Sequence, residues 1–124
     1  MKRSTGVFDF LAIGIAVVLI GGCATCPRTP YRKELTNDPK LEEAQTSYKK
    51  TTYWIDKGDC AVYPFQAKEN YAKAESYLSD TIFKLKRLGS DNNIDVSEEV
   101  EYCERLKSKL DVNIGYADKE MLPP

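Results

Sequence analysis

The chain contains no histidine among its 124 residues. Histidine is the usual general base near neutral pH and a common zinc ligand, so its absence removes every Ser–His and Cys–His nucleophile pair. The sequence also shows no glycine-rich phosphate-binding loop and no nucleophile motif. An enzyme built on this chain would depend on carboxylates or lysine, so we expect a non-catalytic protein without a metal site.

An excess of basic charge is missing as well. Lys and Arg number 18 against 19 Asp and Glu, which gives a formal net charge of −1. Proteins that bind nucleic acid by their phosphates carry a basic excess, so nucleic acid is not an expected partner. The length suffices for one small domain.

A hydrophobic run long enough to span a membrane is also absent. The uncharged run at residues 10–20 (FLAIGIAVVLI) has eleven residues. As a helix it would rise about 16 Å, against a hydrocarbon core of about 30 Å. Because Lys2 and Arg3 precede it, the run fits the core of a secretory signal peptide. An uncleaved membrane anchor is the alternative.

Four residues after this run carry a family resemblance. Ile20, Gly21, Gly22 and Cys23 form a branched apolar residue, two small residues and a cysteine. This order resembles the lipobox of bacterial lipoproteins, although leucine is commoner than isoleucine at its first position. The resemblance implies cleavage between Gly22 and Cys23, a diacylglycerol on the Cys23 sulfur, and an acyl chain such as palmitate on the new amino group. No other cofactor is expected.

Such an anchor determines where the protein lies. Each buried CH₂ contributes about 0.8 kcal/mol, so several acyl chains hold a protein on a membrane almost permanently. Ala24, the residue after the expected lipidated cysteine, resembles the outer-membrane class of these lipoproteins. We therefore expect attachment to the periplasmic face of the outer membrane, with the outer face of the cytoplasmic membrane as the alternative.

The sequence divides into four parts. Residues 1–22 are the expected signal peptide, and residues 23–37 contain the lipidated cysteine and a linker with two prolines and little apolar periodicity. We predict that this linker is a flexible tether, which would reach about 45–50 Å when extended. Residues 38–117 form the predicted helical domain, and residues 118–124 form a flexible tail.

Three amphipathic helical segments are predicted in this domain. Asp38, with Pro39 after it, begins the first segment, Pro64 begins the second, and Asp95 caps the third. Gly58 and Gly89 are expected to end the first two. Each segment has one apolar stripe at spacings of three and four, and short loops place neighbours antiparallel. The predicted fold is an all-α, three-helix, up-down-up bundle on a flexible lipidated tether.

The middle segment carries a second, weaker resemblance. Its sequence YPFQAKENYAKAESYL has a proline-containing turn, alanines on the apolar stripe at positions 67 and 74, and a Tyr-Leu pair. This pattern resembles small helical envelope lipoproteins of poorly defined function. The matching residues are Pro64, Ala67, Tyr71, Ala74, Tyr77 and Leu78.

If Cys23 is lipidated, three cysteines remain, and an exported chain makes disulfides the expectation. Counting suggests a Cys60–Cys103 bond, since both lie in the domain. In an up-down-up bundle, however, they would lie about 25 Å apart along the axis, and a disulfide needs Cα atoms within about 7 Å. A Cys26–Cys103 bond is the alternative, because the tether leads to the start of the first helix. A reduced Cys103 in the core is a third.

The aromatic residues are the candidate partner-binding group. Tyr53 and Trp54 end the first helix, while Tyr63 and Phe65 open the second, so we expect the two pairs near one end of the hairpin. Aromatic side chains are enriched in binding hot spots. The alternative is that they cap a small core. Because Ile55 takes the core position, Tyr53 or Trp54 should be partly exposed.

The sequence thus predicts a lipid-anchored, periplasmic-facing interaction or scaffold module that assists an envelope assembly by binding an envelope protein. One alternative is a small envelope enzyme that uses carboxylates. Another is a pilotin-like accessory lipoprotein of a secretion system. The acidic residues of the third helix, Glu98, Glu99, Glu101 and Glu104, are interpreted as a solvated face in preference to a catalytic pair.

Overall fold

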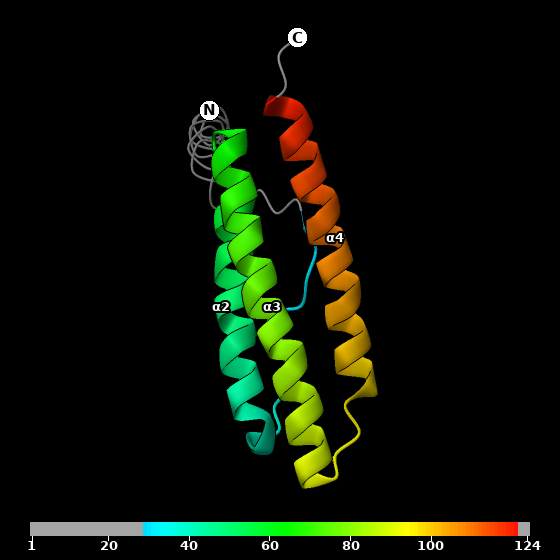
Figure 1. Cartoon of the computed structure of the whole chain (residues 1–124). Helices are drawn as coiled ribbons and strands as arrows, with labels where there is room; N and C mark the ends of the chain where they lie inside the picture. The colour runs from blue at the N-terminus through cyan, green and yellow to red at the C-terminus, as the bar shows by residue number, and fades with distance from the viewer. Residues whose placement is uncertain (1–28, 122–124) are drawn as a thin grey trace, which may run out of the picture.

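The structure is a computed structural model that describes residues 29–121, and it contains three long helices (Figure 1). Helix α2 spans Glu42–Asp59, α3 spans Pro64–Asn92 and α4 spans Ser97–Met121, with a short 3₁₀ turn, η1, at Pro39–Leu41. Helix α3 is the central element and packs against both α2 and α4. The predicted all-α, three-helix, up-down-up bundle is confirmed.

Local signals explain where the helices begin. Asp38 accepts a hydrogen bond from the Lys40 backbone N–H at 2.9 Å, and Pro39 takes the first position of η1. Asp95 caps α4 by accepting from the backbone N–H of Ser97 at 3.0 Å and from its hydroxyl at 2.6 Å. These starts lie where the sequence predicts them.

The helix ends differ from the expectation in two places. Helix α3 passes Gly89 and ends at Asn92, and the capping residue Asn93 adopts a left-handed conformation with φ 57°. Gly89 serves packing instead, since a Cβ there would lie 2.9 Å from a methyl carbon of Val96. Helix α4 continues to Met121, so residues 118–121 of the predicted flexible tail are helical.

The core follows the predicted stripes and is rich in small and aromatic residues. Three alanines that lie on these stripes are buried, which lets the helix backbones approach closely. The buried apolar side chains that form the core cluster are Leu35, Leu41, Ala44, Tyr48, Ile55, Ala67, Tyr71, Ala74, Leu78, Leu85, Cys103, Leu106 and Leu110.

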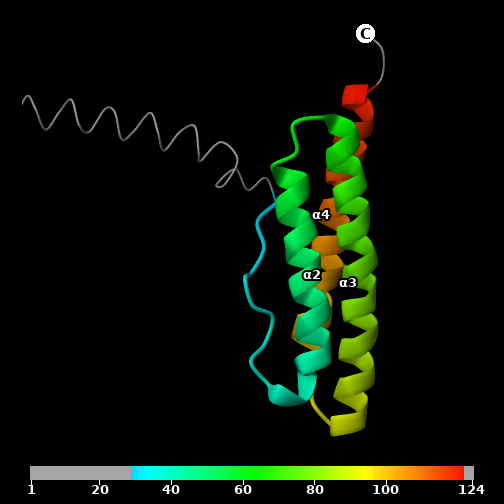
Figure 2. The same cartoon turned by 90° about the vertical axis from the view of Figure 1, so that its left-hand side faces the viewer.

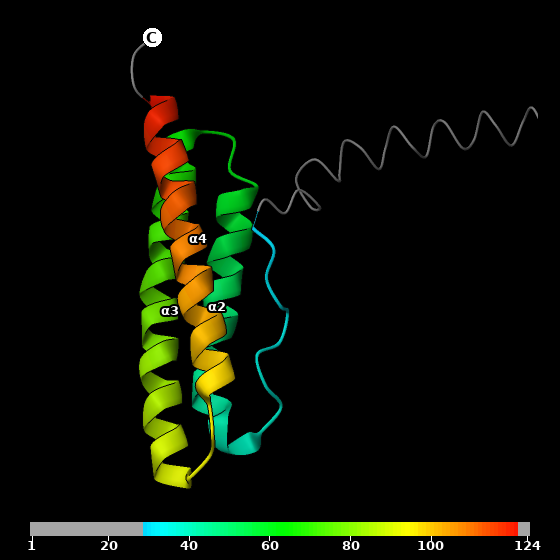
Figure 3. The same cartoon turned by 90° about the vertical axis from the view of Figure 1, so that its right-hand side faces the viewer.

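Residues 29–37, here called the docked segment, differ most from the expectation of a flexible tether. The segment runs beside α2 in the opposite direction, from the C-terminal end of that helix to η1 (Figures 2 and 3). Leu35 enters the core with 6% of its side chain exposed. The Arg32 backbone accepts from the Tyr48 hydroxyl of α2 at 2.6 Å and donates to the Tyr102 hydroxyl of α4 at 2.6 Å. The segment therefore joins α2 to α4.

A buried carboxylate fixes the beginning of this segment. Asp59, at the end of α2, is 1% exposed and accepts from the Thr29 backbone N–H at 3.3 Å, the Thr29 hydroxyl at 3.0 Å and the Tyr71 hydroxyl at 2.5 Å. Asn113 of α4 donates to the Thr29 hydroxyl at 2.6 Å. The docked segment and all three helices thus meet at one polar centre.

Gly58 allows this centre to form, and Gly115 gives a matched comparison. A Cβ on Gly58 would lie 2.6 Å from the Tyr71 ring, whose hydroxyl is held by Asp59, whereas a Cβ on Gly115 would meet nothing within 4 Å. We expect Gly58→Ala to lower the free energy of unfolding by about 1–3 kcal/mol. Gly115→Ala should raise it by about 0.5–1 kcal/mol, because alanine favours a helix. Urea unfolding followed by circular dichroism measures both, and equal effects would contradict this account.

Candidate functional site

The four predicted partner-binding aromatics form two pairs. Tyr53 and Trp54 meet edge to face with their ring centroids 5.1 Å apart. Tyr63 and Phe65 stack with centroids 5.9 Å apart. In the first pair Tyr53 is 53% exposed, and Trp54 packs partly against the core. Ile55 is fully buried and takes the core position, and Tyr53 is exposed. This confirms the prediction that one of the two aromatics before Ile55 is partly exposed.

Two lysines flank the first aromatic pair. The Lys73 ammonium lies 4.4 Å from the centroid of the Trp54 ring, and the Lys57 ammonium lies 5.5 Å from that of Tyr53. A cation over an aromatic face is attracted by the negative charge of the ring centre. The pair therefore presents a rigid apolar surface with positive charge beside it.

The first aromatic pair and Tyr63 of the second pair line different grooves near the same end of the bundle. The first pair lines an open groove of about 770 Å³ between α2 and α3, here called the α2–α3 groove. Its lining includes one cation, Lys57, two carboxylates, Asp56 and Glu69, and the uncharged polar Gln66 and Asn70. Tyr63 lines a second groove of about 350 Å³, together with Pro64, Tyr116 and Ala117. Val62 is common to both.

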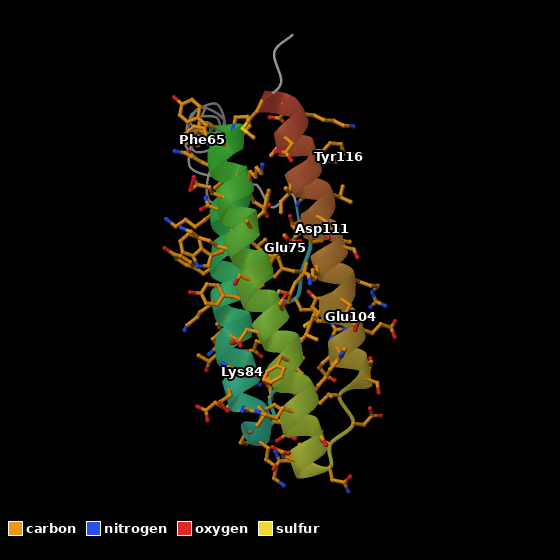
Figure 4. The ribbon with its side chains drawn as sticks, in the orientation of Figure 1. Phe65, Glu75, Lys84, Glu104, Asp111 and Tyr116 are labelled. Atoms are coloured by element: carbon orange, nitrogen blue, oxygen red, sulfur yellow. The ribbon has the colours of Figure 1, made fainter. Side chains whose placement is uncertain are left out.

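Sequence reasoning missed two exposed members of this end. Val62, in the turn between α2 and α3, is 82% exposed, and Tyr116 of α4 is 61% exposed. Figure 4 shows Phe65 and Tyr116 near the same end of the molecule, on α3 and α4. Tyr116 lies off the apolar stripe of its helix, between the partly buried Ile114 and the buried Ala117. Its place off the apolar stripe could have predicted that Tyr116 is exposed.

The lipobox residues Ile20, Gly21, Gly22 and Cys23, together with Cys26, lie outside the described residues. Among the described cysteines, Cys103 is fully buried, and this burial raises the pKa of its thiol to about 12. The structure forms no disulfide between Cys60 and Cys103.

The geometry explains why these two cysteines are not joined. Burial raises the pKa of the Tyr48 hydroxyl and the nearby Cys103 thiol adds to the shift, so Cys103 lies at the height of Tyr48. Tyr48 precedes Cys60 by twelve residues. Those residues correspond to about 18 Å along the helix axis, well beyond disulfide reach. The Cys26–Cys103 alternative assumed that the residues before the first helix lie near its start. Thr29 instead lies at the other end of α2, next to Cys60.

A carboxylate-dependent enzyme would use acidic side chains of α3 or α4. On α4, Glu101 pairs with Arg105 at 2.5 Å while both side chains stay more than half exposed, as expected for a solvated face. Glu75 of α3 and Asp111 of α4 face each other across the helix interface (Figure 4). Burial raises the pKa of Glu75 to about 7, the neighbouring Asp111 carboxyl adds to the shift, and Lys107 opposes it. Neither carboxyl lines the two grooves described above.

Comparison with known proteins found no matching family model, no matching curated protein and no matching solved structure. Within residues 29–121, no helix has the length and apolar character needed to cross a membrane. The same residues contain no group of three or more His, Cys, Asp or Glu side chains placed to hold a metal ion.

The position of Thr29 predicts a disulfide between Cys26 and Cys60. Cys26 precedes Thr29 by three residues, a reach of about 10 Å, and Thr29 bonds Asp59, the neighbour of Cys60. Digestion without reducing agent, followed by mass spectrometry, should yield a peptide that joins these two cysteines.

Cys103 should react with an alkylating reagent only after unfolding, because its thiol is buried and its pKa is raised. A peptide that contains Cys103 bonded to either cysteine would contradict the structure.

Glu75 predicts a pH dependence of stability. Its pKa is raised from 4.5 to about 7 in the folded chain, so its contribution is fully present below pH 4.5 and is lost as the pH rises through 7. Glu75→Gln should therefore stabilise the bundle above pH 7 by about 1 kcal/mol after solvent screening, or a few degrees in melting temperature. Thermal unfolding at pH 5 and pH 8 measures this.

The matched control for Glu75 is Glu69→Gln, on the exposed face of the same helix. It should change the melting temperature equally at both pH values. If Glu75→Gln behaves in the same way as this control, Glu75 does not bind its proton more tightly in the folded state.

Proposed function

We propose that the chain is a lipid-anchored, non-catalytic interaction module on the periplasmic face of the outer membrane, and that it assists an envelope assembly. Diacylglycerol and an acyl chain on Cys23 hold it there, and another envelope protein binds the α2–α3 groove. The anchor is supported by the order of charged start, short apolar run and lipobox at residues 1–23. The cysteine lies six residues before the docked segment.

The observation that carries the binding proposal is the exposed Tyr53 beside Trp54. Two large rings held edge to face on a helix lose little conformational freedom when a partner covers them. The helix cannot roll to bury Tyr53, because Ile55 and Thr51 are fully buried on its opposite side. Such rigid, half-exposed aromatics are the side chains that dominate binding energy at interfaces.

The chemistry of the groove indicates the features of the partner segment. Apolar side chains would pack against the two rings, while the mixed charges of the lining, Lys57 with Asp56 and Glu69, favour a partner without a strong excess of one charge. Gln66 and Asn70 on the α3 side supply hydrogen-bonding groups along the groove. We therefore propose a partner segment that combines apolar and uncharged polar residues.

The test is co-purification of the full chain from membranes in mild detergent, with the partners identified by mass spectrometry. Tyr53→Ala should reduce recovery of the partner at least about tenfold, which corresponds to about 1.4 kcal/mol. Phe83→Ala, which removes a similarly exposed ring on α3 outside the groove, should leave recovery unchanged. Cys23→Ala should leave an unprocessed precursor that carries no lipid.

Two outcomes would contradict the proposal. Equal partner recovery with Tyr53→Ala and Phe83→Ala would remove the groove from binding. A Cys23→Ala protein that is still cut after Gly22 and still floats with membranes would remove the lipid anchor. The melting temperature of each variant serves as the control for folding.

A further inference from the structure

One end of the bundle exposes apolar side chains that come from two separate parts of the chain. We call this end the apolar tip, and it consists of Val62, Tyr63, Phe65, Tyr116 and Met121. Their exposed fractions are 82%, 57%, 51%, 61% and 42%. The turn between α2 and α3 lies beside the end of α4 (Figure 1), and Val62, Tyr63 and Tyr116 line one groove there. Figure 4 shows Phe65 and Tyr116 on two sides of this end. Apolar side chains gathered at one place on a surface call for a covering partner.

The opposite end of the bundle has a different character. The last residues of α3 and the connection to α4 read SDNNID over residues 90–95, and Glu98 and Glu99 follow in α4. This end is polar and acidic, which suits water and disfavours an anionic membrane surface. The two ends therefore differ in the environment that each one fits.

The length of chain before the docked segment decides which end faces the membrane. Cys23 precedes Thr29 by six residues, so the lipid attachment point lies within about 20 Å of Thr29. Thr29 and Tyr71 both bond Asp59 and so lie at the same height along the bundle. From Tyr71, Pro64 is seven residues away toward the apolar tip, or about 10 Å, and Asn92 is 21 residues away in the other direction, or about 32 Å.

We infer that the apolar tip rests against the surface of the lipid bilayer, with Val62, Tyr63 and Phe65 in the headgroup region. This inference depends on the proposed lipid attachment at Cys23. A linker of about 20 Å extends past the tip by about 10 Å but does not reach the polar end. The lipid can therefore enter the bilayer with the tip facing it, and it cannot do so with the bundle inverted.

The chemistry of the tip agrees with an interfacial position. Tyrosine combines an apolar ring with a polar hydroxyl and is enriched where membranes meet water. The nearest ion pair, Lys68 with Asp118 at 2.8 Å, neutralises its own charges and adds no net charge. The tip thus supplies apolar contact next to the anchor, and it places the α2–α3 groove, which shares Val62, close to the membrane.

The test uses the full lipidated chain in vesicles of phosphatidylethanolamine and phosphatidylglycerol that contain bromine-labelled lipids, which quench tryptophan on contact. In a Trp54→Phe background, Phe65→Trp reports on the tip, and Phe83→Trp is the matched control. The control lies on the same helix, is exposed to a similar degree, and is 18 residues or about 27 Å away. We expect Phe65→Trp to lose more than about half of its emission and Phe83→Trp to keep it.

Each other outcome has one meaning when flotation of the vesicles is measured in parallel. If the protein floats and neither tryptophan is quenched, the tip does not touch the bilayer, while the lipid anchor stands. If both tryptophans are quenched equally, the bundle lies on its side, and the inference is overturned. If the protein does not float, the lipid anchor of the proposed function fails, and the orientation fails with it.

Discussion

The buried carboxylate of Asp59 is the constraint on which the rest of the architecture depends. It lies at the C-terminal end of α2, where the partial negative charge of the helix end makes an acidic side chain unfavourable. Its position is stable because the Thr29 and Tyr71 donors surround it. A buried carboxylate without such donors would cost several kcal/mol. The same requirement that satisfies this charge therefore fixes the docked segment, the α2–α3 hairpin and, through Asn113, α4.

The helical part of this fold could be predicted because its signals are local. Apolar residues at spacings of three and four define each stripe, and Asp38, Pro64 and Asp95 mark the beginnings. The helix ends were harder to predict, because a glycine can either stop a helix or make room for a neighbouring side chain. The sequence predicts that Gly89 stops α3, whereas in the structure Gly89 makes room for the Val96 side chain. Only the folded connection between α3 and α4 brings these two residues together.

The docked segment escaped prediction for a related reason. It has no periodicity of its own, and its single core residue, Leu35, is surrounded by polar and charged neighbours. What holds it is tertiary: the Tyr48 and Tyr102 hydroxyls bond its backbone, and Tyr31 bonds Asp56. In the candidate site, too, one feature follows from the local sequence and another from tertiary packing. That Tyr53 is exposed follows from the helix pattern, whereas the separation of the two aromatic pairs depends on how α3 crosses α2.

The direction of the docked segment has a mechanical consequence. The segment runs lengthwise along the bundle, with Thr29 at the end nearest the apolar tip and η1 at the other. A pull on the chain before Thr29 along the bundle axis would load the contacts of Thr29, Tyr31, Arg32 and Leu35 together, in shear, and would not break them one after another. If they gave way, the nine released residues would lengthen the linker by about 30 Å. The segment would thus hold as a stiff attachment under small axial forces and release a reserve of length under large ones.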